Sequence, residues 1–207
     1  LEHSSRLGVD PQPVGPLGLI AMDGCKPLGE KVNEYLVRWE KEPENADQVL
    51  LTYPGYQRDS FLLDADCPRF SSGEGKAVLR QSVRGYDLYI LCDVTNYSNT
   101  YRMYGMEVPM SPDDYFQDLK RIIAAEGKKA KRVSVIMPYL YEGRQHRRST
   151  RESLDCAMAL QEMTNLGIDN IITFDAHDPR VQNAIPHSGF ENAIPHSGKI
   201  GRASCRE

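Results

Sequence analysis

The stretch Tyr86-Asp-Leu-Tyr-Ile-Leu-Cys-Asp-Val94 is the strongest structural signal in this 207-residue chain. Its apolar residues are nearly continuous, which is typical of a strand buried on both faces of a parallel sheet. Similar short apolar runs recur along the chain, at residues 17–22, 132–137 and 170–174. Helical periodicity fills intervals between them, at residues 28–39, 115–123 and 154–166. This alternation predicts an α/β fold, a mainly parallel sheet with helices on both faces.

Two of the expected helices carry clear boundary signals. Ser111 can cap the helix that follows it, Pro112 suits the first helical position, and the acidic residues of the first turn complement the helix dipole. Gly167 is positioned to end the helix at 154–166, because glycine readily adopts the left-handed conformation of a C-terminal cap. The sequence therefore predicts a complete helix at each of these two segments, after which the chain returns to the sheet.

The overall composition limits the classes of partner. Hydrophobic residues make up 40% of the chain and charged residues 26%, and the net charge is −4, so we expect a globular protein with neither nucleic acid nor membrane as a partner. Its five cysteines are odd in number and form no CxxC pair, which favours a reduced, cytoplasmic setting. No apolar run approaches the roughly 18 residues of a membrane span. Any anion-binding site must therefore be local.

The two ends of the chain differ from its middle. Residues 1–16 are rich in Pro, Gly and Ser without periodicity, which predicts a disordered lead-in. The seven residues 183–189 recur unchanged as 192–198, although a structural repeat needs about 20–50 residues. The last nine residues resemble a translated sequencing adapter. We therefore expect a folded domain at 17–191, and a duplicated, adapter-derived tail at 192–207 that follows a truncation near Glu191.

The first candidate site is Arg144-Gln-His-Arg-Arg148, with Arg151 close behind. It follows the strand at 132–137, and ligands of such sheets gather beyond the carboxyl ends of the strands. Four arginines and a histidine within eight residues, in a loop that leads into a helix, suit a polyphosphate. The alternative is a solvated basic turn.

The second candidate is Asp175-Ala-His177-Asp178, directly after the strand at 170–174. Asp175 and His177 are spaced so that they could hold Mg²⁺, which usually brings substrate phosphates with it. The alternative is that Asp178 caps the next turn and His177 packs against the protein.

A third, weaker candidate is the turn Phe70-Ser-Ser-Gly-Glu74. An exposed Phe70 could stack on a base while Glu74 accepts a hydrogen bond from an amino group. Turns of this composition also commonly do no more than join strands.

In order and spacing, these motifs resemble those of the phosphoribosyl pyrophosphate synthetases, also called ribose-phosphate pyrophosphokinases. Three parts carry the resemblance: Ser82-Val-Arg-Gly85 twelve residues after Phe70, Arg144-Gln145 after a strand ending in Met-Pro, and the run 171–177. It extends from about Leu17 to Glu191 and looks like a divergent bacterial branch. It implies phosphoribosyltransferase-like domains, and transfer of diphosphate from MgATP to ribose 5-phosphate that gives phosphoribosyl pyrophosphate and AMP. It also implies assembly into homo-oligomers, from dimers to hexamers.

The resemblance also implies roles for single residues. Phe70 would stack on the adenine of a neighbouring subunit's ATP and Glu74 would bind its amino group, while Ser72 and Gly73 stand where the family has Asn-Gln. The residues implied at ATP are Arg144, Gln145, His146 in place of an Asp, and Arg148 in place of a Lys. The residues implied at Mg²⁺ are Asp175 and His177. Those implied at a regulatory phosphate or ADP are Ser82 and Arg84.

The family's pentose loop and its catalytic Lys and Arg belong to a second domain that has no counterpart in this sequence. We therefore expect an N-terminal half that is inactive alone, without catalytic residues of its own, and that meets ribose 5-phosphate only through that missing domain. The alternative is a non-catalytic regulatory or binding relative that assembles with full-length subunits. A different nucleotide-dependent α/β enzyme remains a third reading, by fold analogy alone.

Overall fold

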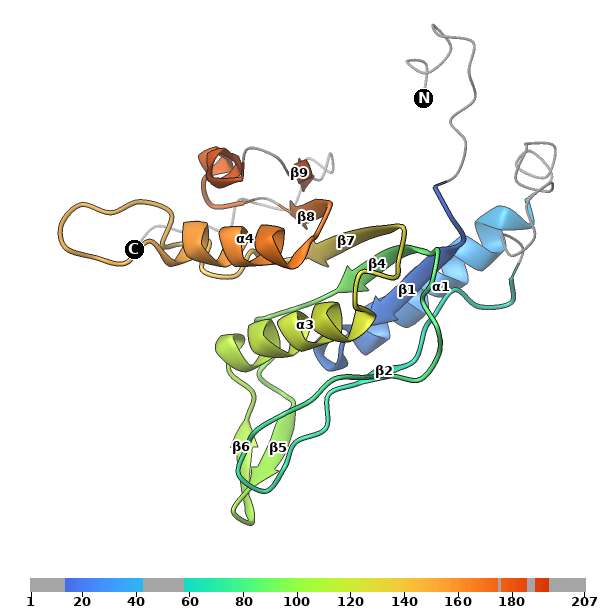
Figure 1. The fold of residues 1–207 in the computed structure, drawn as a ribbon, viewed down its shortest axis with the longest axis horizontal. Coiled ribbons are helices and arrows are strands. Elements are labelled where there is room, and N and C mark those ends of the chain that lie inside the picture. Colours follow the sequence, from blue (N-terminus) through green and yellow to red (C-terminus); the bar gives the residue numbers. More distant parts are fainter. Residues whose placement is uncertain (1–13, 43–57, 175, 186–188, 194–207) are drawn as a thin grey trace, which may run out of the picture.

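The computed structural model describes residues 14–42, 58–174, 176–185 and 189–193. Its centre is a five-stranded sheet in which every neighbouring pair is parallel (Figure 1). In spatial order the strands are β1 (Leu17–Ala21), β4 (Asp87–Leu91), β7 (Arg132–Met137), β8 (Asn170–Phe174) and β9 (Gly189–Ala193). The four strands predicted from apolar runs all form, and the predicted α/β class is confirmed.

The strand order reverses direction beside β1. After α1 (Lys26–Glu40) the chain returns along the free side of β1, where Leu19 N–H donates to Phe61 O at 2.9 Å and Leu63 N–H donates to Leu19 O at 2.8 Å. The chain then crosses to β4 on the opposite side of β1. Ligands of open α/β sheets bind near such a reversal, beyond the carboxyl ends of the strands.

Helices cover both faces of the sheet, as predicted. α3 (Pro112–Glu126) and α4 (Asp155–Leu166) pack side by side on one face (Figure 1), and α1 covers the other. The main apolar layer lies under α3 and α4 and includes Ile20, Leu88, Ile90, Val135, Leu119, Leu160 and Met163. A thinner layer lies under α1 and is formed by Leu19, Cys25 and Leu91 with partly buried neighbours.

The boundary signals in the sequence act as predicted. Ser111 Oγ accepts from Asp114 N–H at 3.1 Å, and Asp114 Oδ2 accepts from Ser111 N–H at 2.9 Å, so α3 begins with a reciprocal capping box. The predicted apolar stripe of α3 is fully buried, at Tyr115, Leu119, Ile122 and Ile123. Gly167 ends α4 with a φ of 97°, a conformation that suits glycine.

A β-hairpin that the sequence analysis did not anticipate projects from the body of the domain (Figure 1). It is formed by β5 (Thr100–Met103) and β6 (Met106–Pro109). Its two-residue turn has φ 50° at Tyr104 and φ 81° at Gly105, which matches the twist of a tight hairpin. The pair Tyr-Gly is a weaker turn signal than Asn-Gly, and this explains why the pattern alone did not reveal it.

A buried ion-pair network ties the hairpin to α3 and to the segment that carries β2 (Ala65–Asp66) and β3 (Val78–Leu79). Arg69 Nη2 lies 2.8 Å from Asp118 Oδ2, and its guanidinium carbon lies 4.9 Å from the centre of the Tyr101 ring. Asp118 also accepts from Arg121 Nη1 at 2.6 Å. Because both Arg69 and Asp118 are buried, removal of either side chain would leave the other charge with a weaker set of partners inside the protein.

The boundaries expected near the ends fall partly outside the described residues. This holds for residues 1–13 of the expected lead-in and for residues 194–207 of the expected tail. β9 includes residues on both sides of the boundary expected after Glu191, since Asn192 and Ala193 pair with Thr173 and Phe174 of β8. The boundary itself stays a prediction. None of the helices in the described part is long and apolar enough to cross a membrane.

The close approach of α1 to the sheet yields a stability prediction. A Cβ atom at Gly29 would lie 2.4 Å from Ala21 Cβ on β1. Alanine is favoured over glycine by about 1 kcal/mol inside a helix, but Ala21 Cβ is fixed to a strand and cannot rotate away. We therefore expect Gly29→Ala to lower the free energy of unfolding by about 1–2 kcal/mol in urea titrations.

Glu30→Ala is the matched control, because Glu30 is the next residue of α1 and its side chain is exposed. We expect it to change the free energy of unfolding by less than about 0.5 kcal/mol. A Gly29→Ala variant as stable as the unchanged protein would show that α1 does not pack on β1 at this distance.

Candidate functional site

Two of the three candidate segments meet at the carboxyl edge of the sheet. The loop at 138–149 follows β7 and the segment at 176–178 follows β8, and these two strands are parallel neighbours. The rings of His146 and His177 have their centroids 5.0 Å apart, and His146 Nε2 lies 3.3 Å from Asp178 Oδ2. The strand pairing therefore places the arginine-rich loop directly against the His-Asp segment.

The arginine-rich loop is fixed by its backbone and by one glutamine. Gln145 N–H donates to Glu142 O at 2.9 Å, and Gln145 Nε2 donates to Ser153 O at 2.9 Å. Gln145 O in turn accepts from Cys156 N–H at 3.3 Å, in the first turn of α4. Gln145, implied at ATP by the resemblance, thus has a structural role whatever it binds.

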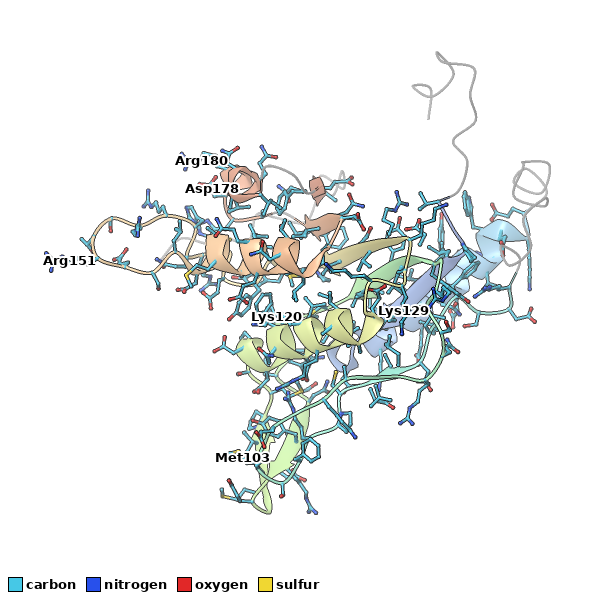
Figure 2. All side chains as sticks on the ribbon, viewed as in Figure 1. Met103, Lys120, Lys129, Arg151, Asp178 and Arg180 are labelled. Atoms are coloured by element: carbon cyan, nitrogen blue, oxygen red, sulfur yellow. The ribbon has the colours of Figure 1, made fainter. Side chains whose placement is uncertain are left out.

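The arginines of this loop extend into solvent. Arg144, Arg147, Arg148 and Arg151 are all exposed, and Figure 2 shows Arg151 at the outer end of the loop. Within the described ranges, no carboxylate lies within 4 Å of any of these four guanidinium groups. Their charge is therefore available to an anionic ligand, and in this respect the loop suits phosphate oxygens.

His146 and His177 play different parts at the contact between the two segments. His146 is largely buried there, with Nδ1 3.1 Å from Arg144 O and Nε2 facing Asp178. Both ring nitrogens face acceptor oxygens, so the ring holds the two segments together. His177 is exposed. The alternative interpretation, in which its side chain packs against the protein, is therefore not observed. It remains accessible to a ligand beside the arginines.

Asp178 caps the turn that follows it, as the alternative interpretation of this segment predicted. Its side chain accepts from Arg180 N–H at 2.9 Å at the start of the short helix η3 (Pro179–Ala184). Arg180 also donates to it from Nε at 3.0 Å and from Nη2 at 2.5 Å. These bonds from Arg180, with a smaller effect from His146, hold the pKa of the Asp178 carboxyl well below its usual range.

Only part of the expected Mg²⁺ site lies within the described residues. Asp175 lies outside the described residues, and the described ranges contain no group of three or more His, Cys, Asp or Glu side chains arranged to hold a metal ion. Mg²⁺ is commonly held by one or two carboxylates together with water and substrate phosphates. The exposed His177 beside the arginine-rich loop is compatible with such a site, because that loop is where phosphates would lie.

The third candidate, the turn at 70–74, lies apart from the other two. Phe70 N–H donates to Glu74 O at 2.7 Å, and Ser72 Oγ donates to Glu74 Oε2 at 2.8 Å. The turn packs on the hairpin, since Tyr104 N–H donates to Ser71 O at 2.8 Å. Figure 2 shows Met103 of the hairpin well separated from Asp178 and Arg180. Phe70 is 53% exposed, and it does not join the arginine-rich loop of its own chain.

The two residues implied at a regulatory phosphate lie at the opposite edge of the sheet. Ser82 and Arg84 precede β4, whereas the arginine-rich loop follows the end of β7. Both side chains are exposed, and Arg84 N–H donates to Ser82 Oγ at 3.4 Å. A phosphate bound there would be separated from the carboxyl edge by the length of the strands.

A cavity beside the arginine-rich loop was not foreseen from the sequence. Its volume is about 450 Å³, within the range of small-molecule sites. Residues 94–97 after β4 form one wall, Tyr139 and residues 141–144 after β7 form another, and Met110 and Pro112 also line the cavity. The sequence contained one signal for this cavity, because three tyrosines follow the carboxyl ends of neighbouring strands: Tyr97, Tyr139 and Tyr141.

Comparison with known proteins identifies relatives for most of the chain. The family model for the N-terminal domain of ribose phosphate pyrophosphokinase matches residues 17–167. Ribose-phosphate pyrophosphokinase 1 of Schizosaccharomyces pombe is 31% identical over 120 residues, which cover 58% of this chain and 26% of that protein. Ribose-phosphate pyrophosphokinase of Chromobacterium violaceum is 30% identical over 129 residues, which cover 60% of this chain and 35% of that protein. The chain thus spans about a third or less of the length of these relatives.

A solved structure shares the fold. Phosphoribosylpyrophosphate synthetase from Mycobacterium smegmatis superimposes with a TM-score of 0.63 at 19% sequence identity. The match covers 86% of this chain and 48% of that chain. It confirms the phosphoribosyltransferase-like α/β fold.

The Asp178–Arg180 pair gives a prediction that can be tested by measuring the pKa of one carboxyl group. In Arg180→Ala, the Asp178 pKa should rise towards the ordinary value of about 3.9, because the group that stabilises the carboxylate is gone. In the unchanged protein, the stability that this pair adds is present above that pH and is lost as the pH falls through the lowered pKa. The measurement is a pH titration of the Asp178 side-chain carbon by NMR.

Arg147→Ala is the matched control, because Arg147 has no carboxylate within 4 Å among the described residues. It should leave the Asp178 pKa unchanged. An Asp178 pKa that does not move in Arg180→Ala would contradict the contact between these two side chains.

Proposed function

Since this chain belongs to the family of N-terminal domains of ribose phosphate pyrophosphokinase, we propose that it forms the ATP-binding half of a ribose-phosphate diphosphokinase. The complete enzyme transfers diphosphate from MgATP to ribose 5-phosphate and releases phosphoribosyl pyrophosphate and AMP. In this chain, the arginine-rich loop binds the ATP phosphates. Ribose 5-phosphate binds through a second domain, and the assembled protein is a homo-oligomer.

One observation carries the proposal: the loop that holds four exposed arginines, without carboxylate partners in the described structure, contacts the His177 segment through His146. Because the β7–β8 pairing places both loops at one edge of the sheet, a polyphosphate bound by the arginine-rich loop would lie at the edge that also carries His177. Positively charged groups around a transferring phosphoryl group stabilise the charge that develops there. The arrangement therefore supports binding of the triphosphate rather than of a neutral ligand.

We also propose a place for the metal ion. Mg²⁺ held by Asp175 and His177 would neutralise part of the phosphate charge and orient the diphosphate group that is transferred. The chain's own side chains do the rest: Arg144 and Arg148 bind phosphate oxygens, and His146 keeps the two loops together. Asp178 is already occupied by Arg180 and His146, so it is not proposed as a ligand.

A non-catalytic relative that assembles with full-length subunits is the second candidate. One observation favours it. The hydrogen bonds from Arg180 occupy both oxygens of Asp178, so a carboxylate next to the metal motif is not open to a ligand. Both candidates bind nucleotide at the same edge of the sheet, and they differ in whether the assembled protein turns it over.

Substitution of Arg144 tests whether the arginine-rich loop binds the phosphates. We expect Arg144→Ala to weaken MgATP binding about tenfold or more, because a charge-assisted contact to phosphate is worth about 1.5–3 kcal/mol. Isothermal titration calorimetry on the 207-residue chain measures it. Binding should also weaken as salt is raised.

Arg80→Ala is the matched control, since Arg80 is an exposed arginine that pairs with Asp66 away from the arginine-rich loop. It should bind MgATP as the unchanged protein does. Equal affinities for the unchanged protein and Arg144→Ala would exclude the arginine-rich loop as the phosphate site.

The isolated chain should bind MgATP without turning it over. The reason is that the resemblance assigns the pentose site and the catalytic Lys and Arg to a second domain. We expect no AMP from ATP, Mg²⁺ and ribose 5-phosphate above the rate without protein, in a coupled or chromatographic assay. AMP release by the purified chain would show that this half is catalytically sufficient.

A further inference from the structure

Two adjacent hydroxyl groups lie between the arginines of the arginine-rich loop, on Ser149 and Thr150. Residues 145–154 form neither helix nor strand, and both of these side chains are exposed. The loop between β7 and α4 extends away from the sheet and its covering helices (Figure 1). Exposed loops of this kind are where proteins are most accessible to other molecules. Another enzyme can therefore reach the backbone around both hydroxyl groups.

The contacts of the two hydroxyl-bearing residues differ. Ser149 is held by a carboxylate, because its N–H donates to Glu152 Oε2 at 3.3 Å and its Oγ donates to the same oxygen at 3.4 Å. Thr150 makes no hydrogen bond within the described residues. A phosphate on Ser149 would face the Glu152 carboxylate, and like charges repel. Thr150 is therefore the better phosphate acceptor of the two.

Positive charge surrounds Thr150 in the sequence. Arg147 and Arg148 stand three and two residues before it, and Arg151 follows it. Within the described ranges, none of these three guanidinium groups has a carboxylate within 4 Å. Protein kinases select their substrates by such charge patterns, and acidic side chains bind arginine well because its guanidinium group pairs with both carboxylate oxygens. The segment before Thr150 thus suits a kinase that recognises arginines.

A phosphate on Thr150 would change the charge of the loop. It would add a charge of about −1.5 to −2 at pH 7 between the arginines. Its oxygen atoms accept charge-assisted hydrogen bonds from guanidinium groups, and Arg148 and Arg151 are close to it in the chain. Guanidinium groups that bind this phosphate are less available to a second anion, and the phosphate itself repels that anion.

We propose that Thr150 is a phosphorylation site for a protein kinase that recognises arginines before its acceptor, and that the phosphate on Thr150 keeps ATP off the arginine-rich loop. In this step, Thr150 Oγ1 forms a bond to the γ-phosphorus of the kinase's own ATP. The bond from that phosphorus to the bridging oxygen breaks, ADP leaves, and the hydroxyl proton passes to the catalytic Asp of the kinase. The regulatory half of this inference rests on the proposed function, because it requires that the loop binds ATP.

Phosphorylation of the 207-residue chain by the catalytic subunit of cAMP-dependent protein kinase, which has this specificity, tests the acceptor. Mass spectrometry of its peptides locates the phosphate. We expect one phosphate, on Thr150, which Thr150→Ala abolishes and Ser149→Ala keeps. Arg147→Ala should slow its addition, because a recognised charge is gone. Arg80→Ala is the matched control, an exposed arginine paired with Asp66, and should not slow it.

A phosphate on Ser149 alone would overturn the assignment of the acceptor. So would a chain that gains no phosphate while a standard peptide substrate in the same mixture is phosphorylated.

The effect on the site is measured by calorimetry with MgATP and with inorganic tripolyphosphate. We expect the phosphorylated chain to bind both ligands about tenfold or more weakly than the unphosphorylated chain, because both ligands use the same arginines. Thr150→Glu should show a smaller loss, and Thr150→Val none. Thr100→Glu is the matched control, since Thr100 is exposed on β5, and it should change neither affinity.

The contact between the phosphate and the arginines has its own readout. The second pKa of phosphothreonine is about 6, and nearby guanidinium groups lower it because they favour the doubly charged form. A phosphorus NMR titration of the phosphorylated chain should therefore give a lower pKa in the folded protein than in urea. Equal values would show that the arginines do not bind this phosphate.

Equal affinities of the phosphorylated and unphosphorylated chains for MgATP would overturn the regulatory half of the inference alone. If the unphosphorylated chain binds neither MgATP nor tripolyphosphate, the proposed function fails and the regulatory half fails with it, while mass spectrometry still decides the acceptor. Thermal unfolding followed by circular dichroism verifies that each variant folds.

Discussion

The parallel pairing of β7 with β8 is the constraint on which the proposed site depends. Met137 lies opposite Thr173 at the carboxyl ends of the two strands, so the loops that follow start side by side. Side chains reinforce this register at the other end, where Asn170 Nδ2 donates to Ser134 Oγ at 3.1 Å and Val133 N–H donates to Asp169 Oδ2 at 2.7 Å. A slip of one residue would turn every side chain of β8 to the opposite face. The contact between His146 and the segment after β8 would then be lost.

The charge arrangement at this edge would allow an acidic protein to bind an anion. The chain carries a net charge of −4, yet four of its exposed arginines gather in one loop. Asp178, which contacts that loop through His146, is already paired with Arg180. A local positive field raises the concentration of anionic ligands near the site, and its effect falls with ionic strength. The position of the charges therefore matters more here than their sum.

Much of the fold was predictable because its signals are local. The apolar run at 86–94 marks a buried strand by itself, and Ser111 with Asp114 forms a cap within four residues. The hairpin at 100–109, the cavity and the position of the Phe70 turn were not predictable, because they depend on contacts between distant residues such as Arg69 and Asp118, which are 49 positions apart. The motifs predicted candidate residues for phosphate binding, and the strand order decided which of them meet.

The central claim is that the arginine-rich loop and the His177 segment act on one polyphosphate. A double-mutant cycle on MgATP affinity tests it most directly, with Arg144→Ala, His177→Ala and the double variant measured by calorimetry. The account predicts that the two losses are coupled, with an interaction free energy of about 0.5 kcal/mol or more, as for groups that share a partner. Losses that add within about 0.3 kcal/mol, or an affinity that does not respond to either substitution, would contradict a single shared site.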